Sequence, residues 1–275
     1  MKRSFTVGAL MALLFLLTRS FFSALLGETG DLIGGIAAAL VSLLTLRISV
    51  LVGLPQRVYY RLLSPAGSYF LFTPFFILMV LGLSALAGAI GSAAGWNDPA
   101  VTYEGPLAWL LLLHAVIPAV CEEITFRYCL PSLLAPYGKA GAILCSSVLF
   151  ALMHTSPVRI PYALTAGLML GLIAEASHSP LPGIVMHCLN NACSLLITLY
   201  GMPALIAVLA VLGVSAFVCL PLLCKRRGGE PFTSLREVIA GRDGMGRMAA
   251  QLVTSPMLVP VAFLLWVTAR SMFLR

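Results

Sequence analysis

Two adjacent carboxylates and an arginine lie at the end of a strongly apolar stretch, in the sequence EEITFR at residues 122–127. An ionisable side chain beside lipid costs several kcal/mol, so such residues need a partner or a function. Glu123 and Arg127 are spaced i, i+4, which brings an acid and a base together on one helix face. Glu122 points about 100° away from that pair and has no such partner on its own helix. This makes Glu122 the first candidate for acid–base chemistry.

Two of the four histidines form short polar patterns on apolar stretches. Phe150 and His154 form FxxxH, and His187 and Asn191 form HxxxN, which places each pair on one helix face. A single histidine in a membrane bundle usually forms a hydrogen bond between helices. Either pattern alone therefore indicates packing, whereas EExxxR, FxxxH and HxxxN in this order are more specific.

With these three patterns the sequence resembles the CPBP family of intramembrane proteases, which includes the CaaX prenyl endopeptidases and the bacterial Abi-type proteases. The resemblance covers roughly residues 106–200, and the matching residues are Glu122, Glu123, Arg127, Phe150, His154, His187 and Asn191. It implies hydrolysis of a peptide bond in a membrane-held substrate, such as a lipidated tail or a precursor peptide.

The residues make this chemistry reasonable on their own. Hydrolysis needs a water that is deprotonated near neutral pH, and a carboxylate in a protein-lined cavity suits that task. We expect Glu122 to be the base and His154 to hold and polarise the water. His187 and the Asn191 amide would donate hydrogen bonds to the oxyanion. The remaining matching residues are expected to support the site: Glu123, Arg127 and Phe150.

A zinc site would use the same atoms, and members of the family are classed as metalloproteases. One carboxylate and two imidazoles form a familiar ligand set for catalytic zinc, here Glu122, His154 and His187. The HExxH pattern is absent from the sequence, and Glu122 as a ligand would leave the role of base to another group. Zinc and a metal-independent glutamate mechanism are both compatible with the sequence, and we favour slightly a site without tightly bound structural metal.

Composition places these residues in a membrane protein. Hydrophobic residues make up 60% of the chain and charged residues 10%, whereas about a quarter of an average soluble protein is charged. The mean hydropathy is +1.01. The seven cysteines form no CxxC pair and are interpreted as small buried hydrophobic residues. The net charge of +7 comes from bases clustered between apolar stretches, so a nucleic-acid partner is rejected.

We predict an all-α fold, a polytopic transmembrane helix bundle of about eight or nine spans. The predicted spans cover about 1–26, 32–54, 69–90, 106–130, 139–154, 162–177, 183–200, 204–224 and 252–273. Pro131 is expected to end the fourth span, and Gly167 and Gly171 to let helices approach closely. The predicted domains are N-terminal spans (1–105), a catalytic core (106–200) and C-terminal spans (201–275) with a basic cytoplasmic loop at 225–251.

Lysine and arginine indicate the orientation. If the spans alternate, the basic loop residues fall on one side and Glu28, Asp31, Asp98 and Glu104 on the other, which predicts a cytoplasmic N-terminus. We expect an integral, multi-pass protein, in the cell membrane if the source is bacterial. Its expected partners are membrane lipid and a membrane-anchored peptide or protein substrate. The basic loop is interpreted as an orientation signal on anionic lipid, with regulatory docking as the alternative.

Five other polar residues have less specific interpretations. Arg19 and Arg47 either reach the membrane interface or face the bundle interior. Glu175 is expected to be a counter-charge to Arg127 or to accept from a neighbouring backbone group. His114 is expected to be a hydrogen-bonding core residue or, less favoured, to tune the site, and His178 to be solvated.

Depths counted from these boundaries conflict with a common site. At about 1.5 Å per residue from the predicted cytoplasmic ends, Glu122 lies about 12 Å deep, His187 about 6 Å and His154 about 22 Å. We give the motif more weight than the boundaries, because boundaries are the least reliable part of such a prediction.

Two further function classes are compatible with the sequence. A non-enzymatic scaffold or regulator, for example in self-immunity against bacteriocins, would keep the protease fold with a polar cluster that only stabilises the bundle. A proton-coupled transporter would use Glu122, Glu123 and Glu175. The transporter is disfavoured because no inverted pair of spans broken by glycine or proline is found.

Overall fold

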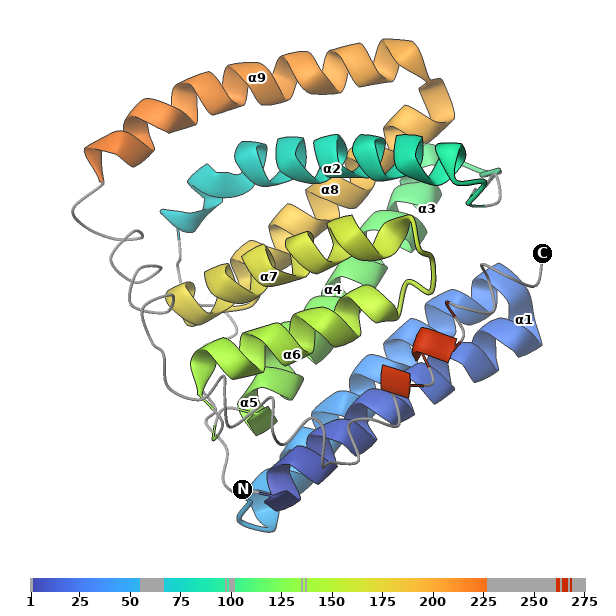
Figure 1. Cartoon of the computed structure of the whole chain (residues 1–275), viewed down its shortest axis with the longest axis vertical. Helices are drawn as coiled ribbons and strands as arrows, with labels where there is room; N and C mark the ends of the chain where they lie inside the picture. The colour runs from blue at the N-terminus through green and yellow to red at the C-terminus, as the bar shows by residue number, and fades with distance from the viewer. Residues whose placement is uncertain are drawn as a thin grey trace.

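The computed structural model describes residues 2–54, 67–96, 98, 102–134, 136, 138–226, 261–262, 264–266 and 268. Within these ranges the chain is helical and contains no β-strand (Figure 1). The predicted loop bases Arg57 and Arg61, the basic loop beyond residue 226 and most of the ninth predicted span lie outside the described residues.

The described helices form an integral, multi-pass membrane bundle, as predicted. In chain order they are α1 (Lys2–Leu51), α2 (Thr73–Ala93), α3 (Leu107–Leu111), α4 (Ile117–Glu123), α5 (Leu130–Leu134), α6 (Lys139–Leu152), α7 (Arg159–Ser177), α8 (Leu181–Tyr200) and α9 (Met202–Lys225). Among the described residues, seven stretches are long and apolar enough to cross a membrane: Thr6–Gly27, Leu32–Leu51, Tyr69–Ala93, Leu107–Leu134, Arg159–Ser177, Leu181–Tyr200 and Met202–Lys225. The fifth predicted span is the shorter helix α6, which has 14 residues.

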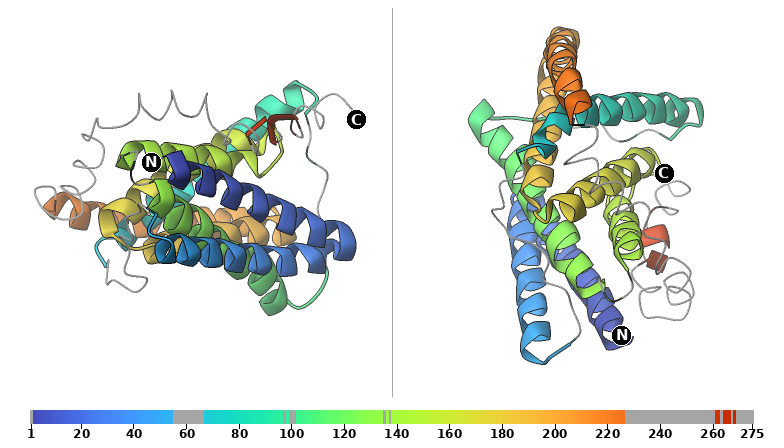
Figure 2. Two further views of the ribbon diagram at one scale, coloured as in Figure 1. Left: turned by 90° about the horizontal axis from the view of Figure 1, so that it is seen from below. Right: turned by 90° about the vertical axis from the view of Figure 1, so that its left-hand side faces the viewer.

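Helix α1 is a hairpin of two spans. Gly27 breaks it with φ 59° and ψ −134°, a conformation that glycine adopts without steric cost. The two halves of the hairpin pack so closely that a Cβ atom on Gly30 would overlap the carbonyl oxygen of Phe22. Figure 2 shows the hairpin at one end of the bundle, with α2 and α9 at the other. Large apolar side chains of α9, such as Phe217, are exposed and therefore available to lipid.

Two π-helical turns, Leu112–Val116 and Ile124–Cys129, join α3, α4 and α5 into one long helix. Each turn ends two residues before a proline, Pro118 or Pro131. A proline ring clashes with the carbonyl four residues earlier, and in both cases that carbonyl belongs to the π-helical turn. The wider turn relieves the clash, so the helix continues. The prediction that Pro131 ends the fourth span is therefore wrong, because helix α5 runs to Leu134.

Helices α6 and α7 lie side by side in the middle of the bundle (Figure 1). A Cβ atom on Gly171 would lie 2.8 Å from Cγ2 of Ile143, and one on Gly167 would lie 3.1 Å from Cβ of Ser147. The small residues therefore set the distance between the two helices, as their spacing predicts. This packing places the end of α6, where Phe150 and His154 lie, against the core helices.

Enlarging Gly171 tests this packing. We expect Gly171→Leu to destabilise the protein by about 1–3 kcal/mol, because the added side chain must displace Ile143 in a close-packed region. The matched control is Gly213→Leu in α9, where a Cβ atom would meet nothing within 4 Å. Both variants remove a helical glycine, so their propensity gains are similar. Thermal unfolding in detergent measures the difference, and equal midpoints would contradict the assigned packing.

Candidate active site

The three motifs come together around one cavity inside the bundle. Glu122 and Glu123 end helix α4, Phe150 lies near the end of α6, and His154 directly follows that helix. His187 and Asn191 lie on α8. The cavity has a volume of about 350 Å³, and its polar lining includes Glu122, His154, His187, Asn190 and Asn191. The fold thus brings the candidate catalytic residues of all three motifs to a shared space.

Glu123 is the centre of a buried network. Its Oε2 lies 3.3 Å from Nε of Arg127, and the exposed fractions of the two side chains are 0% and 1%. Its Oε1 lies 3.0 Å from Nδ1 of His187 on α8. Glu123 therefore neutralises the arginine one turn away and holds the histidine of another helix. No atom of this carboxylate faces the cavity as a base would need to.

Phe150, one turn before His154, packs against Arg127 and both histidines of the site. The guanidinium carbon of Arg127 lies 4.2 Å from the centroid of the Phe150 ring, a cation–π distance. The same ring meets His154 and His187 edge to face, at centroid distances of 5.1 and 5.7 Å. Phe150 therefore fills the space between the buried arginine and both imidazoles.

Glu122 is the carboxylate that faces the cavity. Its Oε2 lies 3.9 Å from Nε2 of His187. Its Oε1 accepts a hydrogen bond from Nη1 of Arg19 at 3.1 Å. Arg19 of α1 thus supplies Glu122 with a counter-ion from 103 residues away, which spacing within one helix does not predict. The spacing argument still holds for its own helix, where Arg127 pairs with Glu123 instead.

Both imidazoles have one nitrogen occupied. Nδ1 of His154 lies 2.9 Å from the carbonyl oxygen of Phe150, and Nδ1 of His187 lies against the Glu123 carboxylate. Carbonyl and carboxylate oxygens only accept hydrogen bonds, so each Nδ1 donates. Nε2 of each ring can therefore contact a substrate or a water molecule in the cavity. A ring held in this way has a fixed orientation and tautomer.

Asn190 and Asn191 are neighbouring residues of the cavity wall, and their side chains contact each other. Nδ2 of Asn190 donates a long hydrogen bond of 3.5 Å to Oδ1 of Asn191. This contact involves only the oxygen of Asn191, and its amide nitrogen is a donor of the kind that an oxyanion would need. Both residues line the cavity with His187.

The observed end of the fourth helix at Leu134 brings the counted depths of Glu122 and His154 close together. Counted from Leu134 rather than Leu130, Glu122 lies about 18 Å from the end of its helix, and His154 lies about 22 Å from Lys139. Helix α8 begins inside the bundle, since Ser177 and Ser179 of the preceding turn are buried. His187 is therefore deeper than its position in α8 suggests. The error was in the helix boundaries and not in the motif.

Other predicted polar residues lie outside the central network. Glu175 pairs with Lys139 at 2.9 Å, so the expectation of a pair with Arg127 is wrong. His114 stacks on Tyr103 at a centroid distance of 4.7 Å and lines the cavity with Glu122. His178 is exposed, as expected.

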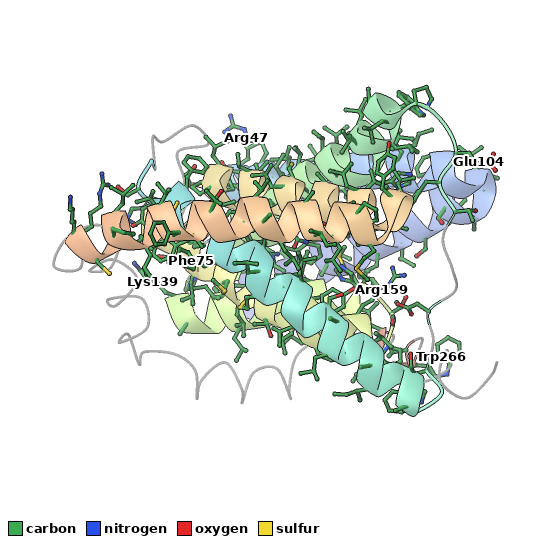
Figure 3. The ribbon with its side chains drawn as sticks, turned by 90° about the horizontal axis from the view of Figure 1, so that it is seen from above. Arg47, Phe75, Glu104, Lys139, Arg159 and Trp266 are labelled. Carbon is green, nitrogen blue, oxygen red and sulfur yellow. The ribbon has the colours of Figure 1, made fainter. Side chains whose placement is uncertain are left out.

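The charged ends of the bundle differ. Figure 3 shows Lys139 and Glu104 toward opposite ends, and Arg47, which is exposed, projecting from α1. Lys225 and Arg226 follow the end of α9. Lys139 therefore lies toward the other end of the bundle from Glu104.

The described residues do not gather three His, Cys, Asp or Glu side chains as a metal site would. Nε2 of His187 lies 3.9 Å from Oε2 of Glu122, and Nδ1 of the same ring is already bonded to Glu123. The predicted ligand set of Glu122, His154 and His187 lines a common cavity without forming such a cluster. Zinc binding therefore stays a prediction.

Two residues of the site were not found from the motifs. Arg19 was visible only as a charge in an apolar span. Gly183 lies on α8 so close to Glu123 that a Cβ atom would be 3.0 Å from its Oε2. This close approach lets His187, one turn later on α8, reach the same carboxylate. Nothing in the pattern around Gly183 indicates this role.

The site thus gathers the Glu122 carboxylate, the imidazoles of His154 and His187 and two amides around one cavity of a multi-pass helical bundle. Residues 104–193 match the model of the family described as type II CAAX prenyl endopeptidase Rce1-like. This segment contains every matching motif residue and confirms the resemblance to the CPBP family. The family implies CAAX-type intramembrane protease activity. No curated protein and no solved structure matched the chain.

The coupling within the central network can be measured. We expect Arg127→Met to destabilise the protein by about 3–5 kcal/mol, because it leaves the Glu123 carboxylate buried without its counter-ion. The double variant Glu123→Gln with Arg127→Met should be less destabilised than the sum of the two single variants. Unfolding in mixed micelles gives the three free energies. Additive losses would show that the two side chains act independently.

Proposed function

We propose that the protein is an intramembrane endopeptidase that hydrolyses a peptide bond in a membrane-held peptide or protein. The observation that carries the proposal is the shared cavity, to which α4, the end of α6 and α8 contribute Glu122, His154, His187 and Asn191. The family match over residues 104–193 supports the same reaction class. A lipidated tail and a precursor peptide are the substrate classes that we propose.

Glu122 acts as the general base in this proposal. The 3.9 Å between its Oε2 and Nε2 of His187 is too long for a direct hydrogen bond, so both atoms remain able to act on a third group. Glu122 takes a proton from a water whose oxygen adds to the scissile carbonyl carbon, and His154 orients that water through Nε2. The protonated Glu122 then gives the proton to the leaving amine as the C–N bond breaks.

The oxyanion of the tetrahedral intermediate needs hydrogen-bond donors. The amide nitrogen of Asn191 is one, because Asn191 lines the cavity and its NH2 group donates hydrogen bonds. His187 is the other when its ring is doubly protonated, since only then does Nε2 donate. Glu123 holds the opposite side of that ring and faces the buried Arg127, so its role is to position the ring.

No step of this mechanism passes through a metal, because the described residues do not gather a ligand set. Zinc held by Glu122, His154 and His187 would instead supply a hydroxide at neutral pH. The chelator arm of the experiment below separates these two versions.

The orientation that we propose places the N-terminus in the cytoplasm. Lys2, Arg3, Lys139, Lys225 and Arg226 are the described loop or terminal bases that support it, with Glu104 on the other side. If the source is bacterial, the bundle would lie in the cell membrane, with the cavity open toward the cytoplasm.

Cleavage of membrane-anchored reporter peptides by the purified protein in lipid tests the function. We expect Glu122→Gln and His154→Ala to lose about 10²- to 10⁴-fold in turnover, the usual contribution of acid–base groups. His178→Ala is the matched control, because His178 is exposed and does not line the cavity. A chelator should leave the wild-type rate unchanged in the glutamate mechanism and abolish it in the zinc version.

The alternative scaffold or regulator makes the opposite prediction. A folded Glu122→Gln variant that keeps the protein's full cellular effect would contradict the protease and favour the scaffold. Retention of the wild-type cleavage rate by this variant would remove Glu122 from its proposed role as the base.

A further inference from the structure

Arg19 contacts the proposed base from outside the segment that matches the family. It lies on the first half of α1, and its Nη1 is 3.1 Å from Oε1 of Glu122. The exposed fraction of the arginine side chain is 35%, and that of the glutamate is 8%. A charge-assisted hydrogen bond of this kind fixes a carboxylate more strongly than a neutral one does.

The pair lies where three cavities meet. These cavities have volumes of about 220, 350 and 360 Å³, and Arg19 and Glu122 are the two residues that line all three. The first cavity extends along the α1 hairpin, the second contains His187 and Asn191, and the third contains His154 and the turn after α6. Each of these three cavities beside Glu122 therefore also has Arg19 in its wall.

Rigid contacts hold Arg19 in this place. Phe15, one turn earlier, is fully buried and packs edge to face on Phe126 at a centroid distance of 5.2 Å. Behind Arg19, a Cβ atom on Gly34 would lie 3.0 Å from the arginine Cα, so the second half of the hairpin supports its backbone. These contacts anchor the backbone of α1 near Arg19 to the long helix that carries Glu122.

We propose that Arg19 is a positioning residue of the active site, an inference that rests on the proposed function. By holding Oε1 of Glu122 it keeps Oε2 on the side of the cavity where Nε2 of His187 lies, and there Oε2 can accept a proton from the attacking water. A carboxylate without this contact can turn and present either oxygen in either direction. The working site therefore includes the first membrane span as well as the matched segment 104–193.

The test uses the full-length protein in lipid and a reporter that the wild type cleaves. We expect Arg19→Ala to lower kcat about 10- to 100-fold, the range for a lost hydrogen bond to a charged group, with little change in KM. Arg19→Lys should keep part of the rate, because it retains the charge. The matched control is Arg47→Ala, an exposed arginine on the same helix, and it should keep the wild-type rate.

Chemical rescue separates positioning from a purely structural role. Methylguanidinium at millimolar concentration, far below denaturing levels, should restore part of the rate of Arg19→Ala and leave the wild type and Arg47→Ala unchanged. The space left by the side chain adjoins all three cavities, so the ion has access.

Three outcomes overturn the inference. Wild-type kcat in Arg19→Ala, with Glu122→Gln inactive, would refute the role of Arg19 and leave the proposed function intact. A loss without rescue, matched by an equal loss in the fraction of folded Arg19→Ala and Arg19→Lys, would show a structural ion pair only. Full activity of Glu122→Gln would refute the proposed function, and the inference with it.

Discussion

A buried charge must find partners within the protein, and the pair of Glu123 and Arg127 imposes this constraint on the whole site. Arg127 is 1% exposed and lies between one carboxylate oxygen and the face of Phe150. The other oxygen holds Nδ1 of His187. Helices α4, α6 and α8 therefore meet around this pair, which brings the Glu123 carboxylate, the Arg127 guanidinium and the His187 ring together. Buried ion pairs add little net stability over apolar residues, so their value here lies in fixing which atoms face the cavity.

The backbone is shaped to bring the helices to these charges. The prolines after each π-helical turn change the path of the long helix before and after the two glutamates, and Pro118 lines the same cavity as Glu122. Gly183 removes the side chain that would keep α8 away from Glu123. Gly27 reverses α1, so that Arg19 packs back on the helix that carries Glu122. A few local departures from a straight helix thus assemble a site from distant parts of the chain.

Local spacing in the sequence predicted the parts of this site that lie within one helix. The i, i+4 rule predicted that Glu123 and Arg127 would meet and that Glu122 would face elsewhere, and composition predicted the all-α membrane bundle. Contacts between helices could not be predicted in this way. Arg19 reaches Glu122 across 103 residues, and Glu175 pairs with Lys139, because tertiary packing decides both. The helix boundary at Pro131 was wrong because a π-helical turn can absorb a proline, and this error placed Glu122 too close to the end of its helix.

The central claim is that Glu122 activates a water molecule and does not itself attack the peptide bond. A single turnover in water enriched in oxygen-18, followed by mass spectrometry of the product and of the enzyme peptide that contains residue 122, tests this claim most directly. The account predicts one labelled oxygen in the new C-terminal carboxylate of the product and none in Glu122. Label in the Glu122 side chain after one turnover would mean that the carboxylate formed a covalent intermediate, and would contradict the proposed mechanism.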